Sequence, residues 1–145
     1  MSAAPRVGVV GHVEWIQFAV VPAVPPAGAI VEASEAFELA AGGGAVAAVQ
    51  LARLAGGARF LTVVGDDEHG RRVCAELRAR GVDLHAAVRP EAPTRRGLTY
   101  LDAEHERTIT LLDPWLVPHG DDALPWAALA ELDAVYLTGG DAPAL

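Results

Sequence analysis

The chain has 145 residues, of which 52% are hydrophobic and 21% are charged. This length and composition are typical of a single globular domain with a substantial core, and they exclude an intrinsically disordered chain. The formal net charge of -8 argues against nucleic acid as a partner, because phosphate binding needs a basic face.

Three strands are expected before residue 40. Residues 6–11 (RVGVVG) form a short, continuous apolar run that predicts a buried central strand. Residues 14–21 are less uniformly apolar and stop at Pro22, which predicts a second strand. Residues 30–39 mix apolar and acidic positions, as a strand with one solvated face does. The acidic positions of that face are Glu32, Glu35 and Glu38. No basic region followed by a long apolar segment opens the chain, so we expect no secretory signal.

Three consecutive glycines at 42–44 lead directly into an alanine-rich segment that predicts a helix to about Ala55. Glycine lets a backbone approach a ligand closely, and the unpaired N–H groups of a first helical turn favour polar or anionic atoms. The same sequence also suits a tight, buried joint between a loop and a helix. Most of the helix surface is apolar, which predicts a largely buried helix. The apolar stretch 39–54 is too short to span a membrane and contains Gln50 and Arg53, so we expect no membrane partner.

Residues 59–65 predict a second buried strand, after which Asp66 or Asp67 can cap a helix that runs to about Arg80. An aspartate pair can also hold a metal, but helix capping is its commoner role. Residues 82–88 then predict a third strand.

Cys74 lies on the apolar side of this helix with Val73 and Leu77. As the only cysteine it cannot form an internal disulfide, so we expect a reducing, cytoplasmic location. No neighbouring motif would activate its thiol as a nucleophile. The histidines are spread without ligand spacing, so no metal site is expected.

Residues 97–101 and 108–112 predict a hairpin with a polar turn between them. These strands and those within about 14–39 are amphipathic and do not suit the middle of a parallel sheet. The sequence therefore predicts an α/β fold, with a parallel-sheet core and a small β-sheet lid built from residues of about 14–39 and 95–112.

A short helix containing Trp126 is expected next, capped by Asp121 or Asp122. Residues 134–137 predict a final buried strand. Asp141 follows it and either caps a further helix or reaches a ligand pocket.

Several segments are weak motifs when taken singly but are more specific in their order and spacing along the chain. They are the opening strand with Gly11, the glycine run at 41–46, residues 64–70 (VGDDEHG), the hairpin at 94–112, and residues 133–140 (DAVYLTGG). Together they resemble the ribokinase-like (PfkB) family of sugar and nucleoside kinases over essentially the whole chain.

The resemblance implies that residues 1–145 form the N-terminal part of one ribokinase-like, Rossmann-like domain, truncated at the C-terminus. It implies transfer of the ATP γ-phosphate, helped by Mg²⁺, to a hydroxyl group of a small sugar-like substrate held between lid and sheet. The family's catalytic aspartate, anion hole and nucleotide-binding loops lie in its C-terminal half. We therefore expect no catalytic, cofactor-binding or metal-binding residue in this chain. The alternative is a non-catalytic binding or dimerisation module, and a homodimer through the lid strands fits either.

Family members usually carry asparagine and aspartate where this chain has Glu14 and Ile16, and asparagine again in the glycine signature. This chain contains no asparagine. Glu14 can still accept hydrogen bonds from hydroxyl groups, although it could equally be an exposed residue of the lid. The usual sugar therefore cannot be assumed. The resemblance places substrate-binding residues at Glu14, Gly42, Gly43, Val46 and Gly140.

Two neighbours of Glu14 have open interpretations. His12 either lines the pocket or does not contact it. Trp15 either shields the substrate or serves in plain packing or a dimer contact. Neither the dinucleotide fingerprint G-x-G-x-x-G nor a Walker A motif occurs.

Overall fold

The computed structural model describes residues 4–144. Its central sheet, sheet A, is entirely parallel and has the strand order β5-β4-β1-β8. Its strands are β1 (Val7–Val10), β4 (Ala58–Gly65), β5 (Val82–Arg89) and β8 (Ala134–Leu137). The continuous apolar runs of β1 and β4 fit this central place, because helical segments lie on both sides of the sheet.

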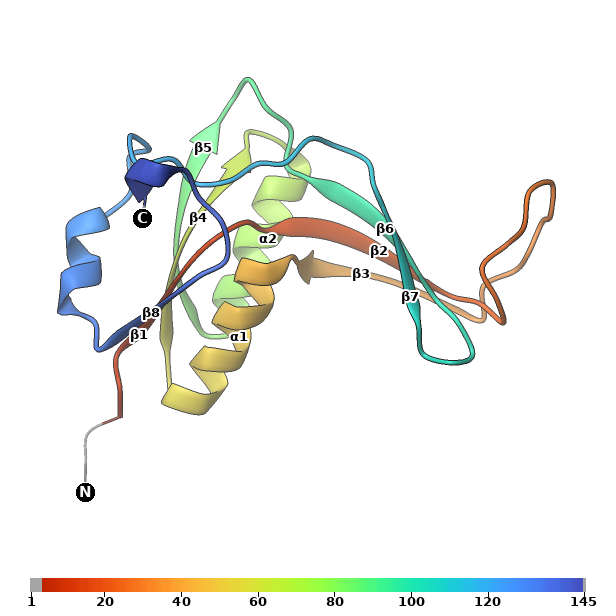
Figure 1. The fold of residues 1–145 in the computed structure, drawn as a ribbon, viewed down its shortest axis with the longest axis horizontal. Coiled ribbons are helices and arrows are strands. Elements are labelled where there is room, and N and C mark those ends of the chain that lie inside the picture. Colours follow the sequence, from red (N-terminus) through yellow and green to blue (C-terminus); the bar gives the residue numbers. More distant parts are fainter. Residues whose placement is uncertain (1–3, 145) are drawn as a thin grey trace.

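Two α-helices, α1 (Gly43–Ala55) and α2 (Glu68–Ala79), lie on one side of sheet A, and the 3-10 helix Trp126–Glu131 lies on the other (Figure 1). The side chains of Phe60 and Leu77 have no exposed surface in the core between the sheet and the α-helices. The expected α/β core is confirmed.

Sheet B is a second, mixed sheet with the order β3-β2-β6-β7. β2 and β6 are parallel, whereas the two outer strands are antiparallel to their neighbours. The strands are β2 (Glu14–Val20), β3 (Glu35–Ala41), β6 (Arg96–Leu101) and β7 (Arg107–Leu111). Sheet B extends away from sheet A (Figure 1), as expected for a second small sheet.

The chain crosses between the two sheets at the carboxyl end of β1. β1 passes into β2 through residues 11–13, and β3 passes directly into α1 at Gly42. Open parallel sheets bind ligands at this end of their strands. The topology therefore brings the glycine run and Glu14 to one place.

The predicted helix ends are confirmed. Asp67 is the N-cap of α2 and accepts a 2.7 Å hydrogen bond from the Gly70 N–H. Gly56 ends α1 in the left-handed conformation, with φ 80°. Cys74 is half-buried, and burial raises the pKa of its thiol, which does not favour a nucleophile.

Three expectations about burial and strand limits are wrong. Residues 30–34 are not part of a strand, and Ile30 is fully exposed. β8 is exposed at all four residues, because among the described residues it pairs only with β1. α1 buries a stripe of small residues, while Val46 and Leu54 face outward.

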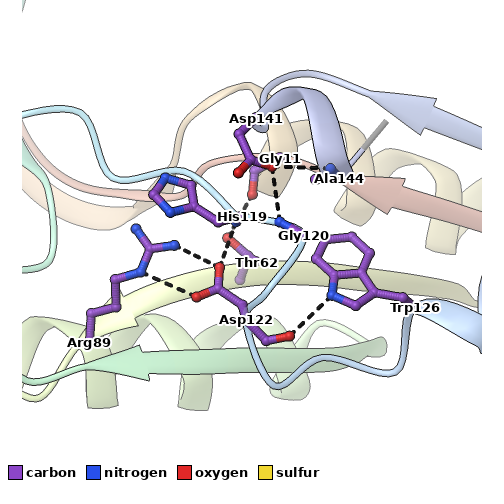
Figure 2. A network of polar contacts seen from close by, with 9 residues as sticks. All are labelled: Gly11, Thr62, Arg89, His119, Gly120, Asp122, Trp126, Asp141 and Ala144. Carbon is purple, nitrogen blue, oxygen red and sulfur yellow. Dashed lines mark hydrogen bonds and ion pairs between the residues drawn. The ribbon is translucent and has the colours of Figure 1, made fainter.

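The predicted aspartate cap of the short helix is also wrong. The helix begins at Trp126 after Pro125 and has no side-chain cap. Asp122 instead accepts a hydrogen bond from Arg89 Nη2 at 2.7 Å, and Figure 2 shows the two side chains facing each other. In the same network Asp141 accepts hydrogen bonds from Gly120 and Ala144, so it caps the short 3-10 turn Ala142–Ala144.

Candidate substrate site

A cavity of about 720 Å³ lies between α1 and one face of sheet B. β2 supplies alternate residues to its wall, because successive side chains of a strand point to opposite faces. The residues from β2 are Glu14, Ile16 and Phe18. This volume is within the range of small-molecule sites.

The glycine run forms one end of this cavity, and His12 already satisfies two of its backbone donors. The Gly43 N–H donates to His12 Nε2 at 3.2 Å, and the Gly44 N–H donates to the His12 carbonyl oxygen at 3.1 Å. A ligand therefore does not find these two N–H groups free. What the run offers a ligand is the absence of side chains.

The structure favours glycine at each of the three positions for a different physical reason. Gly42 has φ +88°, a conformation that side chains disfavour, and it lines the cavity with Gly43. A Cβ on Gly44 would lie 2.6 Å from the His12 carbonyl oxygen and 2.8 Å from the Phe60 ring. Gly44 therefore matches the tight joint, and Gly42 is fixed by its positive φ and crowded by His12 and Glu14, whereas Gly43 matches the open approach.

Glu14 is buried at the inner end of the cavity, with 9% of its surface exposed. Its Oε1 atom lies 3.3 Å from Nη1 of Arg95, which is itself buried, and 3.7 Å from Nε2 of His12. The guanidinium group of Arg95 also lies over the ring of Trp115, 5.0 Å from its centroid. A buried carboxylate needs such a partner, so Arg95 stabilises Glu14 in place.

Burial lowers the pKa of His12 and outweighs the opposing effect of the Glu14 charge, and the smaller effect of the Arg95 charge lowers the pKa further. Because Nε2 accepts a hydrogen bond from Gly43, the proton of the neutral ring belongs on Nδ1. Nδ1 is buried and has no hydrogen-bond partner within residues 4–144, and the same holds for the Thr138 hydroxyl.

Of the other candidate residues, one lines the cavity and two do not. Val46 lies in the cavity wall and is about half exposed. Gly140 lies outside the cavity, beside Pro118 and Ala144. Trp15 points to the opposite face of sheet B, where its Nε1 donates to Glu38 and Arg72 stacks on its ring. It does not shield the cavity.

Sequence reasoning missed several residues of the site. Arg95 and the buried Thr99 reach it only through the pairing of β6 with β2. Gln50 could have been predicted as a site residue, because it lies four residues after Val46 on the same side of the helix.

Within residues 4–144, no group of three or more His, Cys, Asp or Glu side chains is arranged to hold a metal ion. None of the helices in this part of the chain is long and apolar enough to cross a membrane.

Several known proteins are similar to this chain. Fructokinase-1 of Oryza sativa subsp. japonica is 43% identical over 84 residues, which are 56% of this chain and 26% of that protein. A protein assigned as a ribokinase from Agrobacterium tumefaciens superposes with a TM-score of 0.80 at 25% identity, over 92% of this chain and 44% of its own. The ribokinase of Arabidopsis thaliana, solved with ribose and ATP, gives a TM-score of 0.57 at 25% identity, over 75% of this chain and 36% of its own.

The chain thus spans less than half the length of these relatives. The family model described as pfkB family carbohydrate kinase matches residues 4–145. The order of strands, the glycine turn and this match lead to one conclusion: the chain belongs to the pfkB family of carbohydrate kinases.

Proposed function

We propose that the cavity binds a small polyhydroxylated substrate, and that this chain supplies the substrate-binding part of a sugar or nucleoside kinase. The observation that carries the proposal is the buried Glu14 carboxylate at the inner end of a cavity whose adjoining turn is made of glycine. The known relatives support it, since the Arabidopsis thaliana structure contains ribose and ATP.

In this proposal Glu14 accepts a hydrogen bond from a substrate hydroxyl, while Arg95 and His12 contact its Oε1 atom from the protein side. Gly42 and Gly43 let the sugar ring approach the backbone. Val46 packs against the less polar side of the substrate. The proposed site does not include Gly140, because this residue does not line the cavity.

The proposed reaction is transfer of the ATP γ-phosphate to a substrate hydroxyl. The hydroxyl oxygen forms the new bond to phosphorus, the bond to the β,γ-bridging oxygen breaks, and the hydroxyl proton passes to a base. We assign neither the base nor the phosphate-binding groups to this chain. The described residues hold no carboxylate cluster for Mg²⁺, so we derive no step through the metal. A cytoplasmic location belongs to the same proposal.

Calorimetric titration with D-ribose and D-fructose tests the site. Glu14→Gln should weaken binding about tenfold or more, because a charged acceptor of a hydroxyl hydrogen bond is replaced by a neutral one. Glu35→Gln, on the exposed surface of β3, is the matched control and should bind as the unchanged protein does.

Since Glu14→Gln also removes the ion pair with buried Arg95, a second variant keeps the test interpretable. Gly43→Ala places a methyl group at the cavity wall without a backbone clash, since the new Cβ would lie 3.4 Å from His12 Cε1. It should fold and bind the sugars more weakly. Unchanged affinity in both folded variants would move the substrate site elsewhere.

A second candidate function is association of two copies through sheet B. Ile109, Leu111 and Leu112, on and just after the outer strand β7, are each about half exposed. Light scattering of the chain tests this: a dimer that Ile109→Thr and Leu111→Thr dissociate would support it, and a monomer at high concentration would contradict it.

A further inference from the structure

The segment that follows β7 returns from sheet B to sheet A, and an arginine–aspartate pair holds each of its ends. This segment, residues 113–122, is termed the strap. At its start Asp113 accepts hydrogen bonds from Arg96 Nε at 2.8 Å and from Arg96 Nη2 at 3.3 Å. At its end Asp122 accepts from Arg89 Nη2 at 2.7 Å and from Arg89 Nε at 3.3 Å (Figure 2). Bidentate pairs of this kind restrict geometry as well as adding stabilisation.

The middle of the strap is packed into the protein as well. Leu116 is 6% exposed, and the side chain of Pro118 is fully buried. The Pro118 carbonyl oxygen accepts a hydrogen bond from the Asp141 N–H at 3.2 Å, and the Asp141 side chain accepts from the Gly120 N–H at 2.9 Å. Figure 2 shows Gly120 between Asp141 and Asp122. The strap is therefore anchored along its length and can hold a side chain in a defined place.

One side chain of the strap, Trp115, contacts two residues of the candidate site. Its ring centroid lies 5.0 Å from Cζ of Arg95, and it meets the ring of His12 edge to face at 5.4 Å with an interplanar angle of 70°. Trp115 does not line the cavity, and with 61% of its surface exposed it contributes little to the core. Its ring instead touches the two side chains that contact Glu14.

The orientation of Arg95 depends on this contact. A guanidinium group carries several N–H donors in one plane. Within residues 4–144 the guanidinium of Arg95 has one ion pair, from Nη1 to Oε1 of Glu14 at 3.3 Å, and its buried Nε has no hydrogen-bond partner. A single ion pair leaves the plane free to turn about it, whereas an aromatic face beside the cation restricts that rotation. The Trp115 ring is thus the second contact that directs Nη1 toward Glu14.

Trp115 also lies beside Nδ1 of His12. A Cβ built on Gly139 would lie 3.7 Å from this nitrogen and 3.9 Å from Cζ2 of Trp115. Nδ1 is buried, and burial is the largest cause of the lowered pKa of His12. The charged groups that act on the ring are Glu14, which raises its pKa, and Arg95, which lowers it. An indole at this place keeps water from the imidazole and so contributes to its burial.

We infer that Trp115 is a positioning residue of the substrate site. The strap holds its ring against Arg95 and His12, and these two side chains then fix the direction of the Glu14 carboxylate. A carboxylate that is oriented before the ligand arrives binds at a smaller entropic cost. The inference rests on the proposed function, because it takes Glu14 to accept a hydrogen bond from a substrate hydroxyl. Trp115 acts on binding only through its neighbours.

Calorimetric titration with D-ribose and D-fructose tests the effect on binding. Trp115→Leu should weaken binding about threefold or more, the loss expected for a contact between a cation and an aromatic face. Trp115→Phe keeps an aromatic face and should restore most of the affinity. Trp15→Leu is the matched control, because Arg72 lies over the Trp15 ring at 5.5 Å on the opposite face of sheet B. Unchanged affinity in Trp115→Leu, or an equal loss in Trp15→Leu, would overturn the inference.

A double substitution shows whether Trp115 acts through Glu14. In a chain that already carries Glu14→Gln, adding Trp115→Leu should cause little further loss of affinity, because the carboxylate that Trp115 positions is gone. A further loss as large as in the unchanged background would show that Trp115 acts on the ligand by another route, and would overturn the inference.

The titration of His12, followed by proton NMR of its Cε1–H, needs no sugar and therefore separates the two proposals. In the unchanged protein this resonance should titrate below pH 6.5. In Trp115→Leu the midpoint should move toward 6.5, because water reaches the ring, whereas Trp15→Leu should leave it in place. A midpoint that Trp115→Leu does not move would overturn the inference. If the midpoint moves but neither sugar binds the unchanged protein, the proposed function is wrong and the contact of Trp115 with His12 stands.

Discussion

Sheets A and B use similar apolar residues for different purposes, and strands β4 and β7 show the contrast. β4 is buried along nearly its whole length, and Phe60 within it has no exposed surface. β7 is exposed at all five residues, with Ile109 at the cavity. β4 has strand partners on both edges, whereas β7 is the edge strand of its sheet. Apolar side chains are covered by the core in sheet A, whereas those of β7 in sheet B remain exposed, with Ile109 at the cavity.

The largest expected effect comes from a matched pair of substitutions, Phe60→Ala in sheet A and Phe18→Ala in sheet B. Phe60→Ala should lower the free energy of unfolding by about 3–5 kcal/mol, because it leaves a cavity in a fully buried core. Phe18 is half-buried and stacked on Phe37 at 4.9 Å, so its loss should cost about 1–2 kcal/mol. Urea denaturation measures both, and equal losses would show that sheet B contributes to stability as sheet A does.

The same contrast explains which parts of the fold the sequence predicts. β1, β4 and α2 follow from continuous apolar runs and an aspartate cap, which are local signals. The exposure of β8 could not be predicted from its sequence. An apolar sequence favours burial, but it does not show whether another element packs against the strand. The sequence predicts that the strand starts at residue 30, whereas β3 starts at Glu35. The pairing with β2 decides where β3 begins, and local sequence does not show that pairing.

The candidate site was predictable only in part. The glycine run and Glu14 were predicted from motif order, and the topology brings them together. Arg95, which pairs with Glu14, is distant in sequence and has no local signal that identifies it. The use of the Gly43 and Gly44 N–H groups by His12 was equally hidden, because it depends on how β1 crosses to sheet B.

An intermediate effect is expected at the junction of β4 and α2, where Asp67 connects sheet A to the segment that leads into β6. Asp67 accepts hydrogen bonds from Gly70 and from the Thr94 N–H, both at 2.7 Å. Asp67→Ala should cost about 0.5–2 kcal/mol, whereas Asp66→Ala, an exposed neighbour, should cost less than about 0.5 kcal/mol. Thermal unfolding of the two variants measures the difference.

Asp67 also predicts an acid dependence. Burial alone would raise the pKa of Asp67, but the hydrogen bonds from Gly70 and Thr94 outweigh it and hold the pKa below its ordinary value of 3.8. The folded pKa is thus the lower one, so the stabilisation is complete above the unfolded pKa of about 3.9 and is lost as the pH falls through the folded value. Asp67→Ala should reduce this acid-induced loss, and an unchanged acid limb would contradict the assignment.

The smallest expected effect lies at the site itself, in the titration of His12. Burial lowers its pKa from 6.5, so the unfolded chain takes up a proton first as the pH falls. The stability that neutral His12 contributes is therefore present above about pH 6.5 and is lost as the pH falls through the folded pKa. Urea denaturation at a series of pH values should show a shallower decline in His12→Gln than in the unchanged protein. His69→Gln, partly buried in the first turn of α2, is the control for histidines away from the site. If His12→Gln declines as steeply as the unchanged protein, the neutral ring does not stabilise the glycine turn at the junction of the two sheets.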